Sequence, residues 1–294
     1  MQNRKTISIL IILITIFSTI ATVSGIFTNY GTGNYEFKSI NNQIVTIYGK
    51  GVYENMSADV AIQGIAQDYI TLFIAIPLLI VASFLTRKNS LKSKLFLAGV
   101  LNYFFLTYLF YMNMAMYNKL FLVYIILVST AFFAFALTLL SIDIKTISQH
   151  FSPKTPTKSI GSFLIVLPSM IALLWLSVIV PPLIDGSIIP QSVEHYTTLT
   201  VQGFDLSIFL PVAFISGLLL IKKRQFGYLM SSVTIIFLSL LMTALVAKII
   251  AMALFGVNVV PAVFIIPCFL ILSIISSTIL FKNITNDNTI LTNL

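Results

Sequence analysis

Three ionisable residues lie within or at the edge of long apolar stretches: Asp68, Asp205 and Lys248. A charged side chain in the hydrocarbon of a bilayer is costly, so such residues are candidates for function by default. Two carboxylates and one ammonium could bind a charged solute or couple to protons, and we predict that they form a binding site. The alternative is structural. Lys248 lies 21 residues after Gly227, about 31 Å along a helix, where it could pair with one carboxylate or extend its amine to the interface.

A second set of polar side chains recurs at helical spacing in the third apolar stretch. Tyr103, Thr107, Tyr111, Met114 and Asn118 follow one another at steps of four, four, three and four residues, which places them on one helix face. Phenol and amide groups would lack partners in lipid, so this face is predicted to point into the protein. Tyr111 and Asn118 are therefore candidate binding residues in an outward-facing cavity. Hydrogen bonds between helices would explain the same pattern.

One pair of adjacent residues, Glu194 and His195, is a candidate for catalysis. A histidine base beside an acid could serve a membrane hydrolase or transferase, but adjacent residues do not orient one another as triad residues do. The single cysteine, Cys268, and the separation of His150 from His195 give no metal-ligand cluster. No phosphate-binding or dinucleotide-binding glycine motif occurs. We therefore expect no metal, no cofactor and a function that is not enzymatic.

The composition predicts the environment in which these residues work. Of the 294 residues, 58% are hydrophobic and 9% are charged, and the mean hydropathy is +1.00. About a quarter of a soluble domain is charged, so the chain is predicted to be an integral membrane protein with the lipid bilayer as its partner. The net charge of +8 then reflects membrane topology, and nucleic acid is not an expected partner.

Eight apolar runs are long enough to cross the roughly 30 Å of bilayer hydrocarbon as helices. They predict an all-α bundle with transmembrane helices at about residues 7–27, 69–86, 95–113, 120–140, 161–183, 206–221, 227–254 and 259–281. The first run lacks an Ala-x-Ala cleavage signal, so we expect it to remain as an uncleaved anchor.

The positive charges predict the orientation, because loops rich in Lys and Arg stay in the cytoplasm. With both termini in the cytoplasm, most of the 17 basic residues fall in cytoplasmic segments. These residues are Arg4, Lys5, Arg87, Lys88, Lys92, Lys94, Lys145, Lys154, Lys158, Lys222, Lys223, Arg224 and Lys282. Of the acidic residues, only Asp143 and Asp287 fall there. Together with the preference for Lys over Arg, this pattern predicts the cytoplasmic membrane of a prokaryote.

The first four and the last four predicted helices share one plan. Each group has a long outer loop after its first helix and a short basic inner loop after its second, and each second helix carries a proline, Pro77 or Pro211. We predict two four-helix halves, residues 1–142 and 161–294, joined by a cytoplasmic linker at 143–160 and related by parallel duplication. The alternative is that any multi-pass protein obeying the positive-inside rule shows short basic loops. Proline-interrupted helices at matching places in two halves are typical of transporter binding sites.

The outer loop at residues 28–68 is predicted to form a small extracytoplasmic cap. The β-branched run at residues 43–48, followed by Gly49-Lys50-Gly51 and Val52-Tyr53, predicts a hairpin. Apolar residues then recur at helical spacing from Ala58 to Tyr69, which predicts an amphipathic helix leading into the second transmembrane helix.

These observations favour a protein that binds or transports a small or amphiphilic solute through an outward-facing cavity between the two halves. Asp68, Asp205 and Lys248 would carry charge there, and Tyr111 and Asn118 would line the cavity. Two alternatives stay open. One is a structural or sensory subunit whose cap binds another membrane protein, and the other is an outer-leaflet lipid-modifying enzyme that uses His195.

Overall fold

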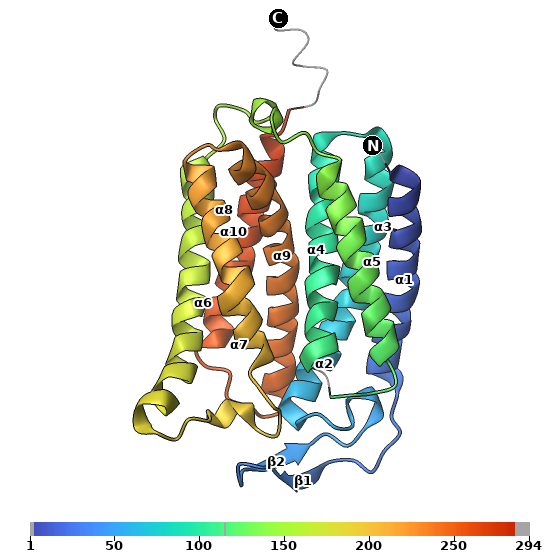
Figure 1. Ribbon diagram of the computed structural model, residues 1–294, viewed down its shortest axis with the longest axis vertical. Coiled ribbons are helices and arrows are strands. Elements are labelled where there is room, and N and C mark those ends of the chain that lie inside the picture. Colours follow the sequence, from blue (N-terminus) through green and yellow to red (C-terminus); the bar gives the residue numbers. More distant parts are fainter. Residues whose placement is uncertain (1–2, 115, 286–294) are drawn as a thin grey trace, which may run out of the picture.

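The computed structural model describes residues 3–114 and 116–285. Within these residues, eight helices are long and apolar enough to cross a membrane, which supports the prediction of a multi-pass helical membrane protein. These helices are Arg4–Phe27, Ala58–Lys88, Leu91–Met114, Phe121–Leu140, Thr157–Asp185, Thr200–Ile221, Gln225–Leu254 and Ala262–Lys282. Figure 1 shows them side by side in one bundle.

The first four transmembrane helices contain five labelled helical segments. They are α1 (Arg4–Phe27), α2 (Ala58–Ile70), α3 (Ile76–Leu85), α4 (Leu91–Met114) and α5 (Phe121–Leu140). The segments α2 and α3 form one continuous helix, because a π-helical turn at Thr71–Ala75 joins them and a 3-10 turn at Thr86–Lys88 ends it. This helix is longer than the sequence predicts, since the expected amphipathic helix runs directly into it.

The last four transmembrane helices repeat this construction. They are α6 (Thr157–Asp185), α7 (Thr200–Phe204) with α8 (Leu210–Ile221), α9 (Gln225–Leu254) and α10 (Ala262–Lys282). A π-helical turn at Asp205–Phe209 joins α7 to α8. Short 3-10 turns at Ile147–His150 and Gln191–Val193 lie in the connecting segments.

The two π turns have a common cause in the sequence. Proline lacks a backbone N–H, and its ring clashes with the carbonyl four residues earlier in an α-helix. Pro77 and Pro211 each lie two residues after the end of a π turn, and the residue between donates to the start of that turn, Ile76 N–H to Thr71 O and Leu210 N–H to Asp205 O. The wider turn relieves the clash, so each proline distorts its helix without ending it.

The helix α9 joins the two groups of transmembrane helices. It contacts α2 and α4 from the first group, and α8 and α10 from the second. Within the groups, α4 packs on α5 and α6 packs on α8. Much of the core therefore lies around α4 and α9, where Leu97, Leu101 and Ile235 are fully buried. Helices α6 and α10 expose mainly apolar side chains, as helices facing lipid do.

The segment between α1 and α2 contains a hairpin, but the predicted strand pairs with residues before it in the sequence and not with Val52-Tyr53 after it. Strand β2 (Ile44–Ile47) falls within the predicted run, and it pairs in antiparallel fashion with β1 (Tyr35–Lys38). The turn lies at residues 39–43, where Asn42 adopts a positive φ of 62°, and Val52-Tyr53 forms part of a 3-10 turn. The chain also reverses at Gly49-Lys50-Gly51, where both glycines have a positive φ, but only a single antiparallel bridge joins Ile47 to Ser57 across this turn. The predicted pairing across the glycines is therefore wrong for the hairpin, whose turn takes its left-handed residue from Asn42.

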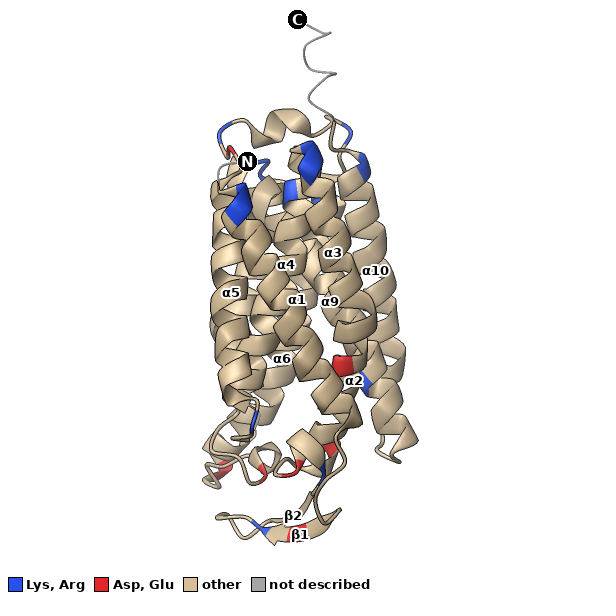
Figure 2. Ribbon diagram, turned by 90° about the vertical axis from the view of Figure 1, so that its right-hand side faces the viewer, with Lys and Arg blue, Asp and Glu red and all other residues tan. Residues whose placement is uncertain are grey.

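The charges separate along the bundle axis (Figure 2). We name the end that carries β1 and β2 the hairpin end, and the end that carries the start of α1, the Thr86–Lys88 turn and Lys222–Arg224 the basic end. Lys and Arg gather at the basic end, whereas Asp and Glu lie mostly toward the hairpin end. Asp287, which the sequence analysis placed with the basic residues, lies outside the described residues.

The close packing of α4 on α9 predicts that Gly99→Ala destabilises the protein. A Cβ atom on Gly99 would lie 2.5 Å from the Cβ atom of Ile236 on α9, and such overpacking costs about 1–3 kcal/mol. The melting temperature of the purified variant in detergent should therefore fall. Gly203→Ala on α7 is the control, because nothing lies within 4 Å of its added Cβ atom. Equal melting temperatures for the two variants would contradict this account of the contact.

Candidate functional site

Asp68 lies in α2 with only 2% of its surface exposed. Tyr53, from the 3-10 turn after the hairpin, donates its phenol proton to Asp68 Oδ2 over 2.5 Å. Tyr111, from α4, lies 3.2 Å from Asp68 Oδ1. A buried carboxylate is stable only when hydrogen bonds or counter-charges compensate its lost hydration, so these two phenols are part of the reason that Asp68 can be buried.

Tyr111 does not fully satisfy Asp68 Oδ1 as a hydrogen-bond donor. Its hydroxyl oxygen lies 2.9 Å from the backbone carbonyl oxygen of Gly64 and 3.2 Å from Asp68 Oδ1. One phenol has a single proton to donate, and the carbonyl oxygen of Gly64 is the nearer acceptor. Asp68 Oδ1 therefore keeps capacity to accept a proton or a hydrogen bond from a ligand.

Helix α1 approaches this site at Gly25, which has no side chain. A Cβ atom on Gly25 would lie 1.8 Å from Asp68 Oδ2 and 3.1 Å from the Tyr53 hydroxyl. Any side chain at this position would displace the carboxylate, so glycine is the residue that allows α1 to approach Asp68. Neither Gly25 nor Tyr53 stands in a motif, so the sequence alone does not identify them as parts of this site.

Further tyrosines surround the same carboxylate. Tyr103 receives a hydrogen bond from Gln67 Nε2 over 2.5 Å, and its hydroxyl lies 2.9 Å from Thr71 Oγ1. The ring of Tyr111 contacts Tyr108 and Tyr124, with centroid distances of 5.8 and 5.6 Å. The Tyr108 hydroxyl is buried without a hydrogen-bond partner in the described structure. Tyr103 and Tyr111 of the predicted stripe therefore point into the bundle, as expected.

The phenol of Tyr53 remains a hydrogen-bond donor. Burial raises the pKa of Tyr53 well above its usual value, and the negative charge of Asp68 raises this pKa further. Both effects disfavour the phenolate form. The proton between Tyr53 and Asp68 is therefore held by the phenol while the carboxylate is charged.

The second carboxylate, Asp205, begins the π turn between α7 and α8. Trp175 on α6 donates its indole N–H to Asp205 Oδ2 over 2.8 Å. Asp205 does not occupy the position equivalent to Asp68. Relative to the prolines, Asp205 corresponds to Thr71, which opens the first π turn, and Asp68 stands about one helical turn earlier.

Lys248 on α9 is partly buried and interacts electrostatically with both Asp68 and Asp205. Among the described residues it donates no hydrogen bond and forms no direct ion pair. The structure therefore brings the three predicted ionisable residues into one electrostatic cluster that spans both groups of helices. The groove between α1 and α3 that is described below does not border this cluster.

Asn118, the last residue of the predicted stripe, lies apart from α4. That helix ends at Met114, and Asn118 Oδ1 accepts a hydrogen bond from the Leu120 N–H over 2.8 Å in the turn before α5. The stripe was predicted as one helix face throughout, but its last member caps a turn.

Glu194 and His195 connect two loops at the hairpin end. His195 Nε2 lies 2.9 Å from the carbonyl oxygen of Asn55, and the next residue, Tyr196, accepts the backbone N–H of Ser57 over 3.1 Å. Burial raises the pKa of Glu194 and is the largest influence on this pKa. No hydrogen bond between His195 and a carboxylate is found in the described part of the chain, so the contacts of His195 are those of a residue that docks one loop on another.

The described residues contain no group of three or more His, Cys, Asp or Glu side chains that could hold a metal ion. Comparisons with protein-family models, with curated proteins and with solved structures gave no match. The function is therefore inferred from the site itself.

The contacts of Asp68 predict that Tyr53→Phe destabilises the protein by about 1–3 kcal/mol, the usual cost of leaving a buried acceptor unsatisfied. Because the phenol acts on the carboxylate, the same change in an Asp68→Asn background should cost less. A double-mutant cycle measured by chemical unfolding in detergent should give a coupling of about 0.5–3 kcal/mol.

Tyr108→Phe is the matched control within the same cluster. Its hydroxyl is buried without a partner in the described structure, so removing it should leave the free energy of unfolding unchanged or raise it. Additive costs for Tyr53→Phe and Asp68→Asn, or equal losses for Tyr53→Phe and Tyr108→Phe, would show that the phenol of Tyr53 does not support the carboxylate.

Proposed function

We propose that the protein binds a small or amphiphilic solute between its two groups of transmembrane helices and moves it across the cytoplasmic membrane of a prokaryote. Asp68, Asp205 and Lys248 form the charged part of the binding site. The observation that carries this proposal is the sharing of Lys248 between two carboxylates from different helices without a direct ion pair to either.

The charge of this cluster favours a positively charged occupant. Two carboxylates and one ammonium carry one net negative charge when all three are ionised, and an uncompensated charge in hydrocarbon is costly. A proton or a cationic group of the solute would neutralise the cluster. Asp68 Oδ1 is the acceptor with capacity for it, since the nearer acceptor of the Tyr111 proton is the Gly64 carbonyl oxygen.

A parallel duplication of the chain would explain why the cluster draws its residues from both groups of helices. In each group of helices a π turn ends two residues before a proline. The packing is also parallel, because α4 on α5 corresponds to α9 on α10, and α1 on α3 corresponds to α6 on α8. π turns are often found at functional sites, and here one of them begins with Asp205 and the other follows Asp68 by three residues.

The orientation in the membrane follows from the separation of charge. The positive-inside rule assigns the basic end and both termini to the cytoplasm. The hairpin and the loop with His195 then form an extracytoplasmic cap over the charged cluster. A solute would enter from the hairpin end, where the acidic residues gather (Figure 2).

This proposal predicts that Asp68→Asn and Asp205→Asn abolish solute binding without preventing membrane insertion. Purified protein in lipid nanodiscs would be screened for thermal stabilisation by small amines, quaternary ammonium compounds, amino acids and sugars. Cationic members of the panel should raise the melting temperature of the native protein, and this increase should disappear in both variants. Lys248→Met should change the selectivity of binding, because the only cation of the cluster is lost.

Asp59→Asn is the matched control, because Asp59 lies in the first turn of α2, the same helix that carries Asp68. It should bind every solute as the native protein does. Undiminished binding by both Asp68→Asn and Asp205→Asn would contradict the proposed site.

The hairpin itself favours a second function, that of a structural or sensory subunit. Phe37 and Ile44 are exposed, and Ile40 in the turn is 93% exposed, which is an unusual position for large apolar side chains outside the membrane-spanning helices. A second membrane protein that covers this hairpin should co-purify with the native chain and be lost from the Ile40→Ser, Ile44→Ser variant. Solute binding that persists in that variant would separate this function from the first.

A further inference from the structure

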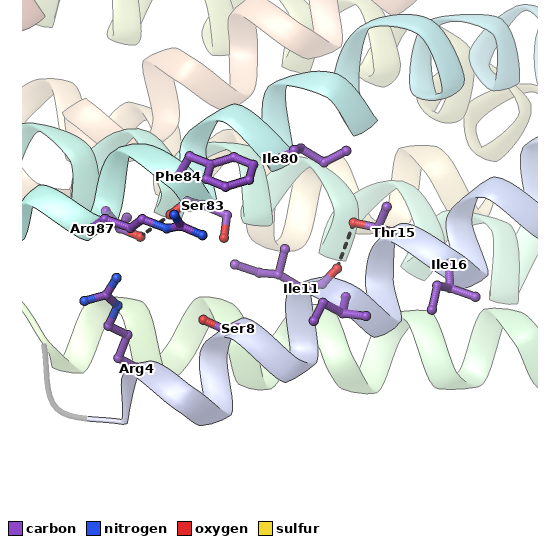
Figure 3. A pocket seen from close by; sticks show the side chains of 11 residues that line it. Arg4, Ser8, Ile11, Thr15, Ile16, Ile80, Ser83, Phe84 and Arg87 are labelled. Carbon is purple, nitrogen blue, oxygen red and sulfur yellow. Dashed lines mark hydrogen bonds between the residues drawn. The ribbon is translucent and has the colours of Figure 1, made fainter.

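A groove between α1 and α3 at the basic end has the shape and chemistry of a lipid site. Its volume is about 320 Å³. Polar residues stand at one end and isoleucines line its length, as Figure 3 shows. The lining residues are Arg4, Ser8, Ile11, Ile12, Thr15, Ile16, Ile80, Ser83, Phe84, Thr86 and Arg87.

Two arginines occupy the polar end of this groove. Arg4 extends from the first turn of α1, and Arg87 extends from the 3-10 turn after α3, with both guanidinium groups at the same end of the groove (Figure 3). The Arg87 guanidinium lies 4.5 Å from the centre of the Phe84 ring. No carboxylate pairs with either arginine in the part of the chain that the structure describes. Two like charges that share one groove without a counter-ion favour a bound anion.

Hydroxyl groups at the same end are free to bind that anion. Neither the Ser8 nor the Ser83 hydroxyl makes a hydrogen bond with a described residue. Guanidinium and hydroxyl groups together suit a phosphate, because an arginine can donate two parallel N–H groups to its oxygens. The anion site is therefore better equipped for a phosphodiester than for a simple halide.

We propose that this groove binds an anionic phospholipid, with its phosphate between Arg4 and Arg87 and an acyl chain along Ile12, Ile16 and Ile80. The apolar length of the groove distinguishes a lipid from free phosphate, since a free anion would gain nothing from the isoleucines. Basic pockets between membrane helices commonly hold lipid headgroups at the interface. This site is separate from the charged cluster, which lies toward the hairpin end.

The test is native mass spectrometry of the delipidated protein in detergent, titrated with phosphatidylglycerol, phosphatidylcholine or inorganic phosphate. Phosphatidylglycerol should bind saturably and more tightly than phosphatidylcholine. Arg4→Gln and Arg87→Gln should each weaken phosphatidylglycerol binding about fivefold, as expected for one interfacial charge. Lys88→Gln should leave binding unchanged, because Lys88 is exposed beside Arg87 but does not line the groove.

A second variant tests the apolar part of the site without changing its charge. Ile16→Trp fills the groove, so it should weaken phosphatidylglycerol binding while both arginines remain. Equal binding of phosphatidylglycerol and phosphatidylcholine, or an equal loss in Lys88→Gln, would overturn the proposal. Displacement of phosphatidylglycerol by inorganic phosphate at the same concentration, or unchanged binding by Ile16→Trp, would identify a free-anion site and overturn the assignment to a lipid.

Discussion

The burial of the Asp68 carboxylate is the constraint on which the hairpin end of the molecule depends. A carboxylate with 2% exposure needs donors, and the chain supplies them from outside α2. Tyr53 comes from the segment after the hairpin, and Tyr111 comes from α4. Gly25 on α1 leaves the space that the carboxylate fills. One buried charge therefore fixes the positions of three helices and of the polar segment between α1 and α2.

The helix α9 extends this constraint to the rest of the bundle. It contacts α2 and α4, and it carries Lys248, whose charge acts on Asp68 and Asp205 together. Asp205 is held in turn by Trp175 on α6. The electrostatic link therefore runs from the first helices through α9 to the second group. Loss of the lysine would leave the buried Asp68 and the partly buried Asp205 without a cation, and the resulting repulsion would act on both groups of helices.

The sequence predicts the helices and the ionisable residues better than it predicts their partners. An apolar run of about 20 residues in a membrane has few alternatives to a helix, because its backbone hydrogen bonds must be satisfied within the protein. The eight helices and the inward face of Tyr103 and Tyr111 therefore follow from the sequence pattern alone. The partners of Asp68 depend on tertiary contacts. Tyr53 stands in a polar loop, and the close approach of Gly25 leaves no local signal. The partner of β2 is not evident from the sequence either, because Asn42 before this strand and the two glycines after it can all adopt the left-handed conformation of a turn.

The packing between the two groups of helices differs between the two ends of the bundle. Gly99 and Ile236 leave no space between α4 and α9, and separating these helices there would create an apolar void. Toward the hairpin end the contacts are polar, since a single phenol is shared between two acceptors and Lys248 has no direct partner among the described residues. Water or a solute can replace such contacts at little cost. Under the proposed function, a solute would therefore reach the cluster from the hairpin end, while the tight contact between α4 and α9 stays closed.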